Sequence, residues 1–166
     1  MRRSKTFRSA WGDAGHKYGA KKYHSNILAH AFKMGLLQHA PPDKFDSIGE
    51  GKYAEHLFAR QQNGEIEDLR FQVRVDLSIN GVRIGRRHMR VDFCYLEHNF
   101  SGTVQHRVVY DEFKGMATPE FKLKRDLWRA GAGPSVLRVT KANKSRAVPY
   151  THEDNWPANL EDERPK

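Results

Sequence analysis

The chain has 166 residues, which is enough for one domain with a substantial apolar core and too few for two comfortable ones. Its 29 Lys and Arg against 20 Asp and Glu give a formal net charge of +9, which favours a polyanionic partner over a merely soluble basic protein. One cysteine, no run approaching the ~18 apolar residues of a membrane span and no apolar segment behind the basic N-terminus predict a cytoplasmic protein without disulfides, signal or membrane anchor.

Residues 1–22 are basic, punctuated by glycine, and contain a single acid, Asp13. We expect a flexible arm here, in which residues such as Lys21 and Lys22 contact a phosphate backbone; a terminus without a role is the alternative. Residues 23–140 are expected to form a single domain. Residues 141–166 are polar, contain three prolines and are expected to form a tail or wrapping segment.

Two helices are expected before the first strand. Residues 27–38 place apolar side chains in rough helical register. The next helix is better marked, because Ser47 and Glu50 form a capping-box pattern at its start. Asn63-Gly64 is a typical helix end.

Three antiparallel strands are expected next. Residues 69–79 alternate apolar and polar side chains, which indicates a half-buried strand. Asn80-Gly81 is a strong hairpin signal that turns the chain into a strand containing Asp92. A second turn, at 98–102, leads into the strand containing Glu112, so the two carboxylates lie on adjacent strands.

Thr118-Pro119-Glu120 predicts the start of a further helix, with a cap, a proline at the first helical position and an acid. Gly131 or Gly133 ends it, and residues 136–139 are expected to form a last strand beside the third. One face of this helix is basic and is a candidate DNA contact, although a solvated face is the alternative; it carries Lys122, Arg125 and Arg129.

The second and third strands carry the candidate site. Side chains two apart on a strand share a face, so Glu112 and Lys114 point the same way and Asp111 points opposite. Converging carboxylates such as Asp92 and Glu112 form a hard-oxygen site suited to Mg²⁺ or Mn²⁺. With a lysine beside them they suit phosphodiester hydrolysis, where charge on the phosphate must be stabilised. Solvent-facing charges at strand ends are the alternative.

This arrangement resembles the PD-(D/E)XK nuclease superfamily, with Val91-Asp92 and Glu112-Phe113-Lys114 as the two halves of its motif. More closely, the chain is similar to small phage-encoded nuclease-like proteins of that superfamily over roughly residues 17–140. The matching stretches are 17–22, 44–47, 64–69 with Gln72, 91–93, 112–116 and 121–125. Val91 replaces the usual proline, and residues 23–43 look like an insertion.

The resemblance implies an α/β fold with a restriction-endonuclease-like core, in which helices flank a central mixed sheet in the order α-β-β-β-α-β. It also implies roles. Asp92 would anchor the metal, Glu112 would complete its ligands, and the Phe113 carbonyl would be a further ligand. Lys114 would position the attacking water and offset charge on the phosphate.

Two more residues match the resemblance. Glu50 would supply an extra acid from the first helix of the core, as a ligand to the metal or its water; a purely structural capping role is the alternative. Gln72 would bond the water or the phosphate, or is an ordinary outward-facing polar residue.

We therefore expect a Mg²⁺- or Mn²⁺-dependent DNA endonuclease that acts on duplex or branched DNA, with a structure-selective enzyme such as a junction resolvase as the favoured type. Paired cuts in opposed strands require two symmetric sites, so a homodimer is expected, with residues 23–43 as a candidate contact unless they pack on their own sheet. The alternatives are a non-selective nicking or end-processing nuclease, and a DNA-binding or assembly protein on a nuclease-like scaffold. RNA remains an alternative substrate.

Overall fold

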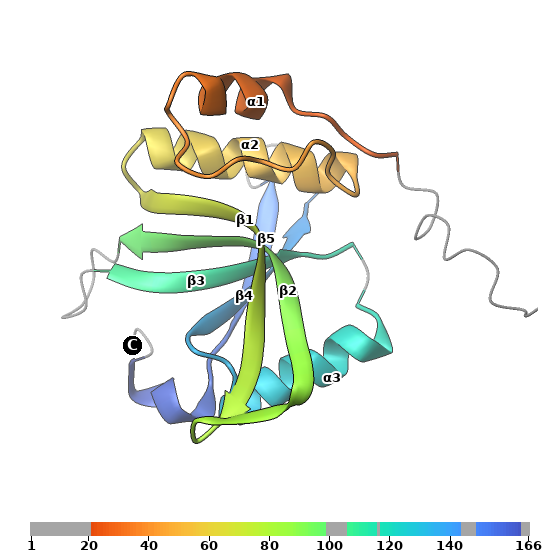
Figure 1. The fold of residues 1–166 in the computed structure, drawn as a ribbon, viewed down its shortest axis with the longest axis vertical. Coiled ribbons are helices and arrows are strands. Elements are labelled where there is room, and N and C mark those ends of the chain that lie inside the picture. Colours follow the sequence, from red (N-terminus) through yellow and green to blue (C-terminus); the bar gives the residue numbers. More distant parts are fainter. Residues whose placement is uncertain (1–20, 99–105, 116, 144–148, 164–166) are drawn as a thin grey trace, which may run out of the picture.

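The computed structural model describes residues 21–98, 106–115, 117–143 and 149–163, so most of the expected basic arm lies outside the described residues. Within them, a five-stranded sheet runs in the order β1-β2-β3-β4-β5 (Figure 1). Its strands are β1 (Ile66–Ile79), β2 (Val82–His98), β3 (His106–Phe113), β4 (Val136–Ala142) and β5 (Tyr150–Asn155). The helices are α1 (Asn26–Lys33), α2 (Ile48–Gln62) and α3 (Pro119–Leu127), continued by the π-helical turn η2 (Trp128–Ala132), and the 3₁₀ segment η3 (Ala158–Glu163).

The sheet is mixed, which confirms the expected α/β class. Strands β1, β2 and β3 form an antiparallel meander. The chain then crosses through α3 and returns as β4, which pairs parallel to β3, and β5 adds antiparallel to β4. None of the helices in the described ranges is long and apolar enough to cross a membrane.

Local signals in the sequence fix most element ends. Ser47 caps α2 by accepting a hydrogen bond from the Glu50 N–H, and Thr118 caps α3 in the same way through the Phe121 N–H. Asn80 and Gly81 both adopt positive φ, as a two-residue hairpin turn between β1 and β2 requires. These predicted features are confirmed.

Helices cover the sheet from both sides. Figure 1 shows α2 across one side with α1 outside it, and α3 near the opposite end of the molecule. Leu57, Phe93 and Val109 belong to the apolar cluster beneath α1 and α2. Val91 and Trp128 belong to a second cluster, beneath α3 and η2.

The β1–β2 hairpin bends between these two clusters. Val91 and Phe93 lie two residues apart and share a strand face, yet they pack in different clusters. Gln72 lies on β1 opposite this point and has a φ of 52°, a conformation that residues other than glycine seldom adopt. The bend gives the hairpin a second half that leaves α2 and runs along α3 (Figure 1).

Two expectations about the ends of the domain need correction. The helix expected over 27–38 ends at Lys33, because Gly35 turns the chain with a φ of 73°. The segment 141–166, expected as a tail or wrapping segment, contributes part of β4 and the whole of β5, and it buries Trp156. The sequence did not indicate β5 because this strand lies at the sheet edge, where most of its side chains are polar and face solvent.

Residues 23–43, interpreted as an insertion, pack on the domain that contains them. Leu28 and Leu37 are buried in the cluster beneath α1 and α2. Other apolar side chains of the segment stay exposed: Ile27, Phe32, Met34 and Leu36. The segment therefore divides between core and surface.

Candidate active site

The N-terminus of α2 carries Glu50 to the sheet. Two glycines beside it allow close packing, because a Cβ on Gly51 would lie 2.1 Å from the Tyr23 ring and a Cβ on Gly49 would lie 2.9 Å from the Phe113 ring. Glu50 is buried, and its Oε1 accepts a hydrogen bond of 3.2 Å from the side-chain amide of Gln72. The carboxyl thus faces the sheet and reaches β1.

Strands β2 and β3 bring the other candidates together. Asp92 Oδ2 accepts a hydrogen bond of 2.9 Å from the backbone N–H of Phe113, which fixes this carboxylate beside the end of β3. Glu112 is buried, and Lys114 Nζ forms an ion pair with its Oε1. The Lys114 ammonium also lies 5.0 Å from the centre of the Phe121 ring, which ties it to α3.

The three carboxyl groups act on one another electrostatically. Burial, together with the charges of Asp46 and Glu112, raises the pKa of Glu50 to about 7. Burial also raises the pKa of Asp92 well above its usual range, and repulsion from Glu112 and Glu50 adds to this. Attraction by these carboxylates raises the pKa of Lys114 although burial lowers it, so the lysine is held protonated.

A hollow of about 260 Å³ opens above this cluster. Asp92, Glu112 and Lys114 line it, together with residues from β2, from α3 and from the loop before α2. These further lining residues are Asp46, His88, Met89, Arg90, Thr118, Glu120, Phe121 and Lys124. Acidic groups and cations therefore meet in one concave site, the arrangement expected of a catalytic pocket.

The cluster fits a divalent cation in charge and in donor type. Glu50, Asp92 and Glu112 together carry three negative charges when ionised, and Lys114 supplies one positive charge, which leaves two uncompensated negative charges. All the donors are hard oxygens, the type that Mg²⁺ and Mn²⁺ prefer. As arranged here, no three His, Cys, Asp or Glu side chains of the described residues enclose an ion, and the Lys114 ammonium contacts Glu112 in their midst.

None of the predicted DNA contacts lines the hollow. Gln72 bonds to Glu50, so it holds the acid rather than facing outward. Arg129 lies in η2 and forms an ion pair of 2.6 Å with Glu153. Lys21, Lys22 and Lys122 are exposed, and Arg125 is half-buried beside Asp126. Within the hollow, α3 contributes Lys124 and not the three basic residues predicted from its sequence.

Sequence reasoning missed Asp46 as a member of the site. Its charge raises the pKa of Glu50, and it lines the hollow. It lies just before the Ser47 cap, inside one of the stretches that carry the superfamily resemblance, which is the signal that marks it. His88 and Arg90 were also missed, although Arg90 shares a strand face with Asp92.

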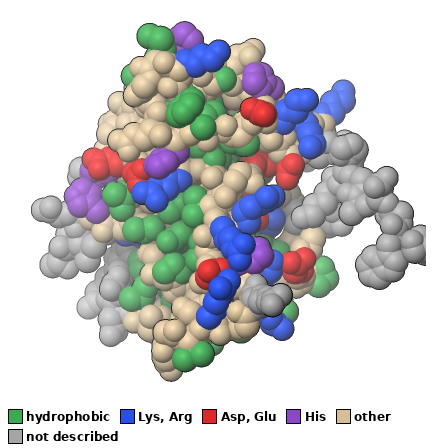
Figure 2. Space-filling view, viewed as in Figure 1, with side chains coloured by type: hydrophobic (Ala, Val, Ile, Leu, Met, Phe, Trp, Pro, Cys, Tyr) green, Lys and Arg blue, Asp and Glu red, His purple; other side chains and the backbone are tan. Residues whose placement is uncertain are grey.

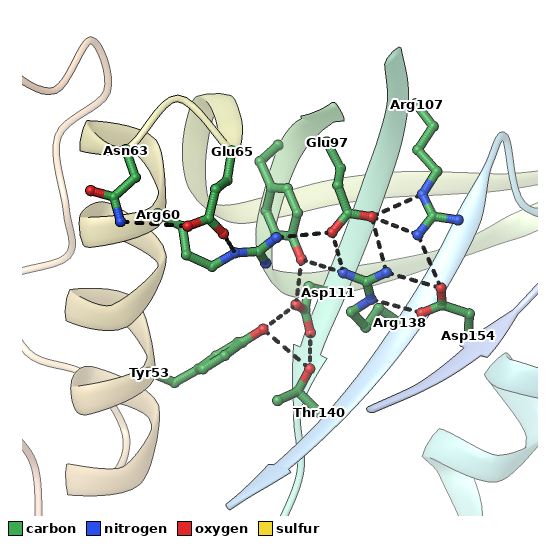
Figure 3. A network of polar contacts seen from close by, with 11 residues as sticks. Tyr53, Arg60, Asn63, Glu65, Glu97, Arg107, Asp111, Arg138, Thr140 and Asp154 are labelled. Carbon is green, nitrogen blue, oxygen red and sulfur yellow. Dashed lines mark hydrogen bonds and ion pairs between the residues drawn. The ribbon is translucent and has the colours of Figure 1, made fainter. Parts of the chain in front are cut away.

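A second polar network lies on the other face of the sheet (Figure 3). Asp111, the neighbour of Glu112, accepts hydrogen bonds from the hydroxyls of Tyr53, Tyr95 and Thr140 at 2.7 to 2.9 Å. Beyond it, Arg138 bonds to Glu97 and Asp154, and Arg60 and Arg107 complete the pairing of Glu97. This network ties α2 to β2, β3, β4 and β5 behind the carboxylate cluster.

Comparison with known proteins gives one match. A family described as "Protein of unknown function (DUF1064)" matches residues 40–147, more than half of the chain. The matched segment contains Glu50, Asp92, Glu112 and Lys114. It begins after α1 and ends before β5. No curated protein and no solved structure matches.

Proposed function

The chain belongs to the DUF1064 family, whose description assigns no activity, and we propose from its site that it is a metal-dependent DNA endonuclease of the PD-(D/E)XK type. The observation that carries this proposal is the convergence of Glu50, Asp92 and Glu112 with Lys114 from α2, β2 and the end of β3, beside a hollow that Asp92, Glu112 and Lys114 line. The order α2-β1-β2-β3-α3-β4 supports a restriction-endonuclease-like core.

Asp92 and Glu112 would hold the cation, with Glu50 completing its surroundings and the Phe113 carbonyl as a further donor. A divalent cation supplies Lewis-acid stabilisation of the phosphate and eases deprotonation of water. Lys114, whose pKa the neighbouring carboxylates raise against the effect of burial, would orient the attacking water and offset negative charge on the phosphate. Gln72 positions the carboxyl of Glu50.

The proposed substrate is duplex or branched DNA, with a four-way junction as the favoured form and a homodimer as the favoured assembly. The exposed apolar side chains of α1 and the turn after it, Ile27, Phe32 and Leu36, are available for a dimer contact, whereas Leu28 and Leu37 are taken up by the core. A cytoplasmic setting agrees with Cys94, a free thiol whose pKa burial raises to about 11.

The alternative is a DNA-binding or assembly protein on a nuclease-like scaffold. The observation on its side is that no three His, Cys, Asp or Glu side chains in the described ranges enclose an ion. Against it stands the electrostatic strain in the cluster, since a scaffold without catalytic work gains nothing from buried carboxylates that repel one another.

The test is incubation of the purified protein with linear, nicked, forked and four-way-junction DNA, with and without Mg²⁺ or Mn²⁺. We expect cleavage that EDTA stops, that Asp92→Ala abolishes and that Lys114→Ala slows by at least ~10²-fold. Asp126→Asn removes an exposed carboxylate of α3 and is the matched control, with wild-type activity expected. Cleavage by Asp92→Ala at the wild-type rate overturns the site.

A second measurement separates metal binding from turnover. At pH 8, Mg²⁺ or Mn²⁺ in excess should raise the thermal midpoint of the wild type, because a ligand that binds only the folded state stabilises it. Asp92→Asn should lose most of this rise. Equal rises of the thermal midpoint in both proteins would mean that the metal binds outside this cluster.

A further inference from the structure

The outer face of the bent β1–β2 hairpin carries a row of positive charge. Arg74 on β1 is the direct cross-strand partner of Arg90 on β2. Arg83 extends the row toward the hairpin turn, and the imidazole of His88 lies on the same face. Figure 2 shows Lys and Arg side chains gathered over this hairpin. We call Arg74, Arg83, His88 and Arg90 the basic hairpin face.

This face leads to the carboxylate cluster. Side chains two apart on a strand share a face and are separated by about 7 Å, so His88, Arg90 and Asp92 follow one another along the same side of β2. All three line the hollow, with Lys124 of α3 on its other side. A polyanion lying along the hairpin would therefore reach Asp92 directly.

The basic hairpin face is short of negative charge. Two arginines directly opposite each other on antiparallel strands destabilise the pair. Arg74 and Arg83 share one carboxylate, Asp76, at 3.4 and 2.9 Å, and all three side chains are about half exposed. Exposed ion pairs of this kind are weak and exchange readily for another anion. Within the described residues, no carboxylate pairs with Arg90.

We propose that the basic hairpin face binds the phosphate backbone of duplex DNA and guides it to the carboxylate cluster. Phosphates supply the negative charge that the arginine pair lacks, and the row gives the backbone a direction across the site. The inference deepens the proposed function and rests on it for the scissile phosphate; the binding surface itself does not depend on cleavage. It differs from the contacts predicted on α3 and on the N-terminal arm.

The test is the salt dependence of DNA binding by the full chain in EDTA, where no cleavage is expected, with a labelled linear duplex. Each lost phosphate contact lowers the slope of log Kd against log salt by about 0.9, so Arg74→Gln/Arg90→Gln should lower it by about 2. Affinity at moderate salt should fall about tenfold or more. Arg74→Lys/Arg90→Lys keeps the charge and should keep most of the slope.

The matched control is Lys33→Gln/Lys52→Gln, which removes the same charge from exposed positions on α1 and α2. It should leave the slope nearly unchanged. An equal fall in both double variants, or none in the arginine variant, overturns the proposal, as does a wild type that binds no DNA at low salt. Both arginines are exposed and repel each other across the strands, so the thermal midpoint of the arginine variant should equal or exceed that of the wild type.

Two further arms separate the proposals. With Mg²⁺, Arg74→Gln/Arg90→Gln should raise KM more than it lowers kcat, since it removes contacts to the DNA backbone and leaves the carboxylates and Lys114 in place. Loss of DNA binding in this variant, together with a wild type that cleaves nothing, supports the hairpin surface and removes the nuclease assignment. Tighter arginine-dependent binding of an RNA duplex of the same length overturns the choice of DNA.

Discussion

Asp111 and Glu112 are neighbours on β3, but they lie in opposite kinds of polar surroundings. Asp111 faces α2 and accepts three hydroxyl hydrogen bonds. Glu112 faces the hollow, among carboxylates that repel one another. Successive side chains of a strand point to opposite faces of the sheet. Asp111 therefore joins the hydrogen-bond network beneath α2, and Glu112 lines the hollow.

The ion pairs behind the sheet are balanced in charge, and the cluster in the hollow is not. Arg60, Arg107 and Arg138 match Glu65, Glu97 and Asp154, three charges against three (Figure 3). Burial alone would raise the pKa of Glu97, but hydrogen bonds from Arg138 and Arg107 lower it to about 2. Glu50, beside the hollow, has a pKa raised to about 7. The ion pairs behind the sheet are thus balanced in charge, whereas the carboxyl groups beside the hollow repel one another.

The largest expected difference is that substitution of Glu112 lowers activity, whereas substitution of Asp111 lowers stability. Glu112→Gln should lower the cleavage rate by at least about 10³-fold, because a cation ligand worth several kcal/mol of charge stabilisation is lost. Its thermal midpoint without metal should stay close to that of the wild type, because the repulsion that is relieved offsets the lost ion pair with Lys114. Asp111→Ala, one residue away, should lower stability instead. Paired melting curves and cleavage assays check both, and a destabilised but active Glu112→Gln would reverse the assignment.

Breaking the balanced network should cost stability. Arg138→Leu leaves Glu97 and Asp154 buried without their main partner, so the free energy of unfolding should fall by about 3 kcal/mol. The matched control is Arg129→Leu, which removes an exposed pair with Glu153 and should cost less than about 1 kcal/mol. Urea unfolding of both variants decides, and equal losses would mean that burial does not distinguish the two pairs.

The contributions of Glu50 and Glu97 to stability should change with pH in opposite directions. The pKa of Glu50 is raised to about 7, so its contribution to stability is present below its ordinary value of 4.5 and is lost as pH rises through 7. At pH 8 without metal, Glu50→Gln should therefore be more stable than wild type by on the order of 2 kcal/mol, and this gain should vanish near pH 4.5.

Glu97→Gln is the opposite case and the control. The pKa of Glu97 is lowered to about 2, so its contribution is present above 4.5 and is lost as pH falls toward 2. The variant should be less stable than wild type at pH 7, and the difference should narrow only in strong acid. Unfolding free energies from pH 2 to 8 check both residues, and parallel curves would contradict the comparison.

The smallest effect is expected at Gln72. Gln72→Ala removes a single hydrogen bond to Glu50, worth about 1 kcal/mol, so the cleavage rate should fall by less than about tenfold. Gln72→Asn is the control for the backbone, because asparagine tolerates positive φ but its shorter side chain does not keep the bond. If Gln72→Ala were as inactive as Asp92→Ala, Gln72 would contact the reacting atoms.

The sequence by itself determined the features that depend on neighbouring residues. The Ser47 and Thr118 caps, the Asn80-Gly81 turn and the alternation that turns Glu112 and Lys114 to one face are local, and the structure has all of them. The sequence also placed Asp92 and Glu112 on adjacent strands, because the meander follows from the turn signals.

Only the tertiary structure decided which groups meet across elements. Asp46, the bond between Gln72 and Glu50, and the choice of Lys124 over Lys122 depend on how α2 and α3 approach the sheet. The bend at Gln72 turns the hairpin, and β5 completes the edge of the sheet, although neither has a strong local pattern. Packing against distant residues fixes such features, so the polar residues of β5 and the non-glycine Gln72 gave no sign of them in the sequence.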